Sequence, residues 1–212
     1  MSITIVPPLA PAPPIASILP PAFPPEPIIR ISVEQYHVMI EAGAFANDER
    51  VELLEGWLVP KMSKNPAHRV VTRKLRIAFE RLLPPGWEVE SEVPVTTVDS
   101  EPEPDVAVVR AGVLDKVERH PGPRDVGMLI EVSDSTLARD RGIKKRLYAR
   151  SAVPVYWIVN IPDRCIEVYT DPTGPAENPD YRQPRVYGEN DQVPIVLDGK
   201  EIGQLEVKSI LP

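Results

Sequence analysis

The order of the apolar segments between residues 66 and 170 most constrains what this chain can fold into. A helical pattern comes first, then three strand-like segments, a second helical pattern and two more strands: PAHRVVTRKLRIAFERLL, WEVESEVPV, PDVAVVR, VGMLIEV, TLARDRGIKKRLYARSA, VPVYWIVN and RCIEVYT. Strands interleaved with helices in this order predict the α/β class, with a mixed central sheet flanked by helices.

Two shorter patterns precede this region. SVEQYHVMIEAGAF predicts a short helix with Ser32 as its N-cap, and VELLEGWLVPKM predicts two strands that turn at Glu55–Gly56. In the helix that begins near Pro66, four residues at steps of four, three and four form an apolar stripe: Val71, Leu75, Ala78 and Leu82.

The first 29 residues differ in composition from the rest, because many of the 27 prolines of the chain lie there. Proline has no amide hydrogen to donate, so residues 1–29 are predicted to be a disordered or polyproline-type extension, followed by one domain over residues 30–212. Prolines interrupt each apolar run, so neither a signal peptide nor a membrane span is expected. The extension is either a ligand for a proline-binding partner or a spacer.

Charge and cysteine content bear on the partners of the protein and on its cellular compartment. The net charge of −7 argues mildly against a generic nucleic-acid coat protein, although a local basic patch remains compatible with it. Cys165 is the single cysteine, so no disulfide forms within one chain, and this fits a reducing cytoplasm.

Two carboxylates occupy matching places in the strand-like segments. Asp105 opens PDVAVVR, and Glu131 nearly closes VGMLIEV. If these successive strands pair in the antiparallel sense, both acids reach the same end of the sheet. Two carboxylates at such an edge repel each other unless a proton or a cation lies between them, and oxygen ligands of this kind suit Mg²⁺ or Mn²⁺.

The second helix carries Asp140 and Lys144 within its apolar stripe. A charged side chain on an inward face is costly unless it has a partner. One explanation is an i,i+4 pair between Asp140 and Lys144 at the margin of the stripe. The other is that Lys144 reaches the end of the sheet where Asp105 and Glu131 meet. The convergence of two acids and a lysine from three segments favours the second.

Five stretches resemble the bacterial "putative restriction endonuclease (Uma-type)" family of the PD-(D/E)XK nuclease superfamily. They are VELLEGWLVPKMS with Glu52, PAHRVV with His68, EPEPDVAVV, LIEVSDSTLARDRGIKKRLYARSAVPVYWIVN and RCIEVY. The resemblance spans roughly residues 31–170, and the block from Leu129 to Asn160 is its most specific part. It implies a restriction-endonuclease-like core and a metal-dependent endonuclease that hydrolyses DNA phosphodiester bonds with a metal-activated water.

The resemblance also implies roles for residues. Asp105, Glu131 and the backbone carbonyl of Val132 would hold Mg²⁺ or Mn²⁺, and Glu52 is an additional acid near the site. The superfamily usually has lysine two positions after the glutamate, where this chain has Ser133. Related families move that lysine to the following helix, which points to Lys144. The expected products carry a 5′-phosphate and a 3′-hydroxyl.

DNA contacts are expected along the two helices, from His68, Arg69, Arg73, Arg141 and Lys145. The alternatives are solvated helix faces for the basic residues and, for His68, a helix-start histidine bonded to a neighbouring carbonyl. A homodimer is a further expectation, because cutting both strands of a duplex needs two sites.

Three functions stay open from the sequence. The first is the metal-dependent DNA endonuclease. The second is a non-catalytic nucleic-acid or protein-binding module on a nuclease fold, which the presence of Asp105, Glu131 and a lysine argues against. The third is a glycosidase that uses Asp105 and Glu131 as its acid pair and needs neither metal nor lysine.

Overall fold

The computed structural model of the chain describes residues 29–45 and 50–212. The predicted proline-rich extension lies outside these ranges apart from Ile29. Among the described residues, no helix combines the length and the apolar character that crossing a membrane requires.

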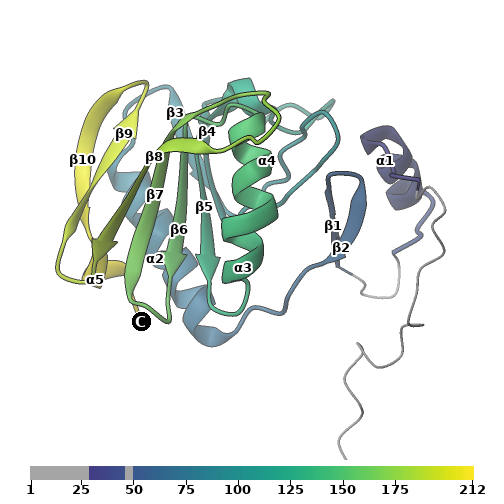
Figure 1. Cartoon of the computed structure of the whole chain (residues 1–212). Helices are drawn as coiled ribbons and strands as arrows, with labels where there is room; N and C mark the ends of the chain where they lie inside the picture. The colour runs from purple at the N-terminus through teal and green to yellow at the C-terminus, as the bar shows by residue number, and fades with distance from the viewer. Residues whose placement is uncertain (1–28, 46–49) are drawn as a thin grey trace, which may run out of the picture.

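A six-stranded mixed sheet forms the centre of the protein (Figure 1). Its strands lie in the order β3-β4-β5-β6-β7-β8, with the bounds Trp87–Glu90, Val106–Arg110, Val126–Ser133, Val155–Asn160, Cys165–Pro172 and Tyr181–Gly188. A single 3₁₀ turn, η2 (Pro123–Asp125), leads into β5. All neighbours are antiparallel except β5 and β6, which are parallel. The predicted α/β class with a mixed central sheet is therefore confirmed.

The parallel pair requires a crossover connection, and a helical segment from Leu137 to Arg150 provides it. The segment consists of α3 (Leu137–Arg139), a π turn, η3 (Asp140–Lys144), and α4 (Lys145–Arg150). In the π turn the amide of Lys145 donates to the carbonyl of Asp140, five residues earlier. The sequence predicted a regular helix here. The wider turn keeps both Asp140 and Lys144 buried, and π turns are frequent at functional sites.

One face of the sheet is covered by α2 (Pro66–Leu82) together with β9 (Gln192–Leu197), β10 (Lys200–Glu206) and α5 (Val207–Ile210). In Figure 1, α2 lies behind the sheet and the pair β9–β10 lies beside it. The buried face of α2 passes through His68, Val71, Leu75 and Phe79. The predicted stripe is correct for its first two residues, but Ala78 and Leu82 are only partly buried because the helix turns Phe79 toward the sheet.

The opposite face of the sheet is covered by the crossover segment, in front of the sheet in Figure 1. Leu147, Tyr148 and Ala149 of α4 are fully buried against it. The Tyr148 and Tyr156 rings meet edge to face, with centroids 5.0 Å apart. This packing holds the crossover segment, and with it Lys144, in a fixed position above the end of β5.

The first part of the chain forms a smaller unit beside the sheet, at the right of Figure 1. It comprises α1 (Val33–Glu41) and the hairpin of β1 (Val51–Leu54) and β2 (Trp57–Pro60). Ser32 caps α1 as predicted, and Glu55 and Gly56 form the predicted turn with positive φ angles of 49° and 78°. The amide of Glu101 donates to the carbonyl of Leu53, which fixes the hairpin against the segment that leads into β4.

The core between α2 and the sheet sets a test of the fold. Phe79 is fully buried and meets Trp157 edge to face, with ring centroids 5.8 Å apart. Phe79→Ala is expected to lower the free energy of unfolding by about 3–5 kcal/mol, through lost burial and the cavity left behind. Val70→Ala, at a position 40% exposed on the same helix, is expected to change it by less than about 0.5 kcal/mol. Urea unfolding of the two variants measures both values, and equal effects would contradict this packing.

Candidate active site

The candidate site lies where β4 begins and β5 ends. In the antiparallel pairing of these strands Val106 faces Ile130, so Asp105 and Glu131 reach the same end of the sheet, as predicted. Both side chains are buried, with exposed fractions of 6% and 3%. Burial of two carboxylates in one place is costly without compensating charge, so the neighbouring side chains decide how the site is stabilised.

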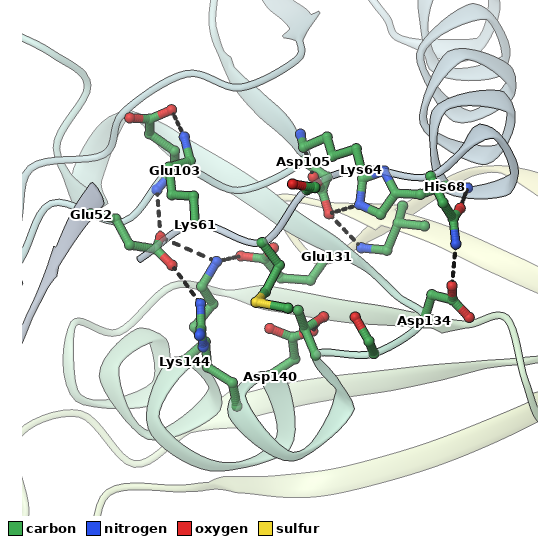
Figure 2. Close-up of a pocket in the computed structure, with 17 residues that line it drawn as sticks. Glu52, Lys61, Lys64, His68, Glu103, Asp105, Glu131, Asp134, Asp140 and Lys144 are labelled. Atoms are coloured by element: carbon green, nitrogen blue, oxygen red, sulfur yellow. Dashed lines mark hydrogen bonds and ion pairs between the residues drawn. The ribbon is translucent and has the colours of Figure 1, made fainter. Parts of the chain in front are cut away.

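A cavity opens at this end of the sheet, and charged side chains line it (Figure 2). Six carboxylates contribute to the lining: Glu52, Glu103, Asp105, Glu131, Asp134 and Asp140. Four cationic groups oppose them, those of Lys61, Lys64, Arg139 and Lys144. The lining thus contains two more carboxyl groups than cationic groups.

Asp105 is held by three donors. The Lys64 ammonium lies 2.8 Å from Oδ1, while His68 Nε2 lies 3.0 Å from Oδ2 and the amide of Val132 donates to Oδ2 at 2.8 Å. Burial alone would raise the pKa of Asp105, but the hydrogen bond and charge of His68, together with Lys64, hold this pKa below its usual value. Asp105 is therefore a carboxylate over the whole physiological pH range.

Glu131 is held by two donors that both come from the crossover segment. Lys144 Nζ and the Tyr148 hydroxyl donate to its Oε1, each at 2.9 Å. Burial, with smaller contributions from the charges of Asp140 and Asp105, raises the pKa of Glu131 to about 8 against the lowering effect of Lys144. The other oxygen, Oε2, accepts no hydrogen bond from the described residues. Because every fully buried side-chain oxygen among these residues has a hydrogen-bond partner, Oε2 is not fully buried and is the oxygen that faces the cavity.

Lys144 joins Glu131 to Glu52. Its Nζ lies 3.3 Å from Glu52 Oε2, and Glu52 is itself 2% exposed on β1. Although burial disfavours the charge, Glu131, Glu52 and Asp140 raise the pKa of Lys144 above its usual value. Lys144 is thus a charged ammonium group at the end of the sheet. This agrees with the prediction that Lys144 reaches the acids there, and not with a marginal pair to Asp140.

Asp140 does not take Lys144 as its main partner. Its Oδ2 accepts hydrogen bonds from Ser133 Oγ and Thr136 Oγ1, both at 2.6 Å. Ser133 lies two positions after Glu131, and its hydroxyl secures the start of the crossover segment through Asp140. Burial raises the pKa of Asp140, against the lowering effect of Lys144 and the two hydroxyl groups.

The residues expected to contact DNA separate into three groups. The His68 ring contacts the carboxylate of Asp105, so the neighbouring-carbonyl explanation is wrong. Arg69 and Arg73 are exposed on α2 and form no ion pair within the described part of the chain. Arg141 binds Glu167 through two nitrogens, with Nη2 2.6 Å from Oε1, and Lys145 lies 2.9 Å from Asp180. Ion pairing favours the solvated-face explanation for these last two residues.

Several cavity residues were not foreseen from the sequence. Lys61 and Lys64 come from the KMSKN segment between β2 and α2, where no periodic pattern marks the direction of a side chain. Lys61 forms an ion pair with Glu103, and Asn65 donates a hydrogen bond to Asp134. Tyr148, whose hydroxyl donates to Glu131 Oε1, was not singled out from the sequence either.

The donor set fits a hard divalent cation. Asp105, Glu131 and Glu52 offer carboxylate oxygens, the kind of ligand that such an ion prefers. Because the N–H and C=O of one strand residue point to the same side, the Val132 carbonyl faces the end where its amide meets Asp105. In the ranges described, however, no three His, Cys, Asp or Glu side chains are gathered closely enough to hold an ion. Lys64 pairs with Asp105, and Lys144 pairs with Glu131.

Comparison with known proteins identifies relatives of the fold. The family model Uma2, described as "Putative restriction endonuclease", matches residues 33–202. No curated protein matches the chain. The crystal structure of a "putative nuclease belonging to DUF820" from Anabaena variabilis ATCC 29413 is similar, with a TM-score of 0.58. It is 15% identical over 77% of this chain and 90% of that chain, a likeness that shows the fold alone.

The contact between Lys144 and Glu131 can be tested by measuring the stability of variants. Lys144→Met leaves Glu131 and Glu52 buried without their counter-charge, and is expected to lower the free energy of unfolding by about 3–5 kcal/mol at pH 8. The loss is expected to be smaller at pH 6. There Glu131, with its pKa of about 8, is protonated in the folded wild type as well as in the variant, so Lys144 no longer neutralises a charge on it.

Adding Glu131→Gln to Lys144→Met removes the buried charge and is expected to recover part of the lost stability. Urea unfolding of the single and double variants at both pH values measures these differences. Losses that simply add would show that the two side chains do not interact in the protein.

Proposed function

This chain belongs to the Uma2 family, described as "Putative restriction endonuclease", and from that membership we propose that residues 30–212 form a metal-dependent endonuclease domain that hydrolyses DNA phosphodiester bonds. The observation that carries the proposal is the gathering of Asp105, Glu131 and Lys144 in one cavity at the end of the sheet. A fold-level likeness alone would not support an activity, because one fold hosts many functions.

The ion for this site is Mg²⁺ or Mn²⁺, because carboxylate and carbonyl oxygens are the ligands that these ions prefer. Asp105 and Glu131 would hold it, with the Val132 carbonyl as a further ligand and Glu52 as an additional acid. When bound, the ion supplies positive charge at the phosphate and promotes ionisation of the attacking water.

The side chains around the acids supply orientation and charge. Tyr148 and Lys144 both bond to Oε1 of Glu131, which leaves Oε2 directed into the cavity. The ammonium of Lys144 offsets the negative charge that builds on the phosphate oxygens as the new bond forms. His68 fixes the orientation of Asp105 through Oδ2, at 3.0 Å.

The DNA backbone is proposed to lie along the start of α2. Arg69 follows His68 directly, and Arg73 lies one turn further on, with both side chains exposed. Free guanidinium groups next to a phosphodiester site contribute sequence-independent affinity through phosphate contacts. The cleavage of both strands of a duplex would bring two such domains together as a homodimer.

An activity test follows from the two acids. In the presence of Mg²⁺ or Mn²⁺ the protein is expected to nick plasmid DNA, and a chelator is expected to stop it. Asp105→Asn and Glu131→Gln are each expected to reduce the rate by about 10²-fold or more, because each removes a carboxylate that would hold the ion at the reacting phosphate. Plasmid and oligonucleotide cleavage assays measure the rates.

A matched control is Asp198→Asn, which alters an exposed carboxylate paired with Arg110 at 2.8 Å and should leave the rate unchanged. Cleavage that persists in both acid variants, or in chelator, would contradict the proposal. DNA binding without any cleavage would instead support the non-catalytic binding module.

A binding test follows from the free arginines. In an Asp105→Asn background, the double change Arg69→Ala and Arg73→Ala is expected to weaken DNA binding and to reduce the slope of log K against log[salt] by about two. Arg182→Ala, which alters an exposed arginine paired with Asp171, is the control and should leave the slope unchanged. Fluorescence anisotropy over a salt series measures the slopes; equal slopes for all variants would exclude the α2 surface.

A further inference from the structure

Both oxygens of Asp105 already have a partner. Lys64 takes Oδ1, at 2.8 Å, while His68 and the amide of Val132 share Oδ2. A cation that binds Asp105 through Oδ1 must therefore meet the Lys64 ammonium, which carries the same sign of charge. The repulsion between the two cations is relieved when one of the three donors moves, and the surroundings of the donors decide which.

Two of the three donors are fixed by the fold. The amide of Val132 belongs to β5, in the centre of the sheet, and cannot move without breaking the strand pairing. His68 is packed in the first turn of α2, where its own amide bonds to Asn65 and its Nδ1 lies 3.4 Å from the Thr72 hydroxyl. Their contacts to Oδ2 are part of the scaffold.

Lys64 differs from both. It lies in the segment between β2 and α2, outside any helix or strand, and its side chain is 24% exposed. It also has a second partner, because its Nζ lies 2.6 Å from Oε1 of Glu92, two residues after β3, and the Glu92 side chain is 41% exposed. If Lys64 leaves Asp105, its ammonium keeps one carboxylate and gains water, so the move leaves no buried charge unpaired.

The lysine at the other acid has no such freedom. Lys144 is 5% exposed, lies in the π turn of the crossover segment, and contacts two buried acids, Glu131 and Glu52. Its removal would leave Glu131 without a cationic partner and Glu52 with only Arg139, at 3.7 Å. The lysines that pair with Glu131 and with Asp105 therefore have different roles: Lys144 stays in place, and Lys64 can move away.

We propose, on the basis of the metal-dependent function above, that Lys64 is a built-in substitute for the metal ion, which occupies Asp105 Oδ1 in the metal-free protein and shifts to Glu92 when a divalent cation binds. In the metal-free protein, the ammonium of Lys64 stabilises the buried carboxylate of Asp105. It also competes with the ion, so the metal affinity of the wild-type protein is lower than the carboxylates alone would give.

If Lys64 competes with the ion for Asp105, removing the charge of Lys64 should strengthen metal binding. Lys64→Met keeps an unbranched side chain without the ammonium, and Mn²⁺ is expected to bind this variant more tightly than the wild type, by roughly tenfold, since no like charge remains at Oδ1. In the absence of metal, the same variant should unfold at a lower temperature, because Asp105 loses one counter-charge. The rise in unfolding temperature on adding Mn²⁺ should then exceed that of the wild type.

Lys61 provides the matched control. It lies in the same segment and lines the same cavity, but it pairs with Glu103 and not with Asp105. Isothermal titration calorimetry of Mn²⁺ into the full-length wild type, Lys64→Met, Lys61→Met and Asp105→Asn compares the affinities. The expected order is Lys64→Met above the wild type, Lys61→Met within about threefold of the wild type, and little binding to Asp105→Asn.

The other outcomes distinguish a failure of the proposed role of Lys64 from a failure of the proposed function. Unchanged or weaker binding to Lys64→Met, with wild-type binding that still depends on Asp105, would overturn the role of Lys64 and leave the proposed function standing. Equal tightening in both lysine variants would show a general effect of charge and would also overturn it. No Mn²⁺ binding to any variant would overturn both the role of Lys64 and the metal-dependent function.

Discussion

The burial of Asp105 next to Glu131 is the interaction on which the rest of the site depends. Antiparallel pairing of β4 with β5 brings the two carboxylates to one end of the sheet, and each is less than a tenth exposed. Such a placement is costly unless cationic or hydrogen-bonding groups surround the acids. The chain supplies them from three separate segments: Lys64 from the segment before α2, His68 from α2, and Lys144 from the crossover.

The topology explains why these segments converge. The parallel pair β5–β6 needs a crossover, and the crossover begins directly after the end of β5, where Glu131 lies. Ser133 secures that start through Asp140, and the π turn then directs Lys144 back toward the acids. On the other face, α2 begins with His68 beside Asp105, and the β1–β2 hairpin contributes Glu52. Each side chain thus reaches the cavity from the end of an element that the core already fixes.

Most of the fold followed from residue patterns. The alternating faces of PDVAVVR and VGMLIEV indicated where Asp105 and Glu131 would lie, and an inward charge in an apolar stripe singled out Lys144. The π turn was not predictable, because it depends on packing across the sheet rather than on periodicity. Lys64 was missed for a different reason: its direction is set by Asp105 and Glu92, which are distant in sequence, and an irregular segment carries no pattern to reveal this.

The most direct test of one cation site shared by Asp105 and Glu131 is a crystal structure of the protein grown with Mn²⁺, with the ion located by its anomalous scattering. A single strong peak is expected within about 2.0–2.6 Å of carboxylate oxygens from both Asp105 and Glu131. Lys64 Nζ should then lie nearer to Glu92 than to Asp105. A structure in which the manganese peak lies elsewhere, while Lys64 still contacts Asp105, would contradict the account.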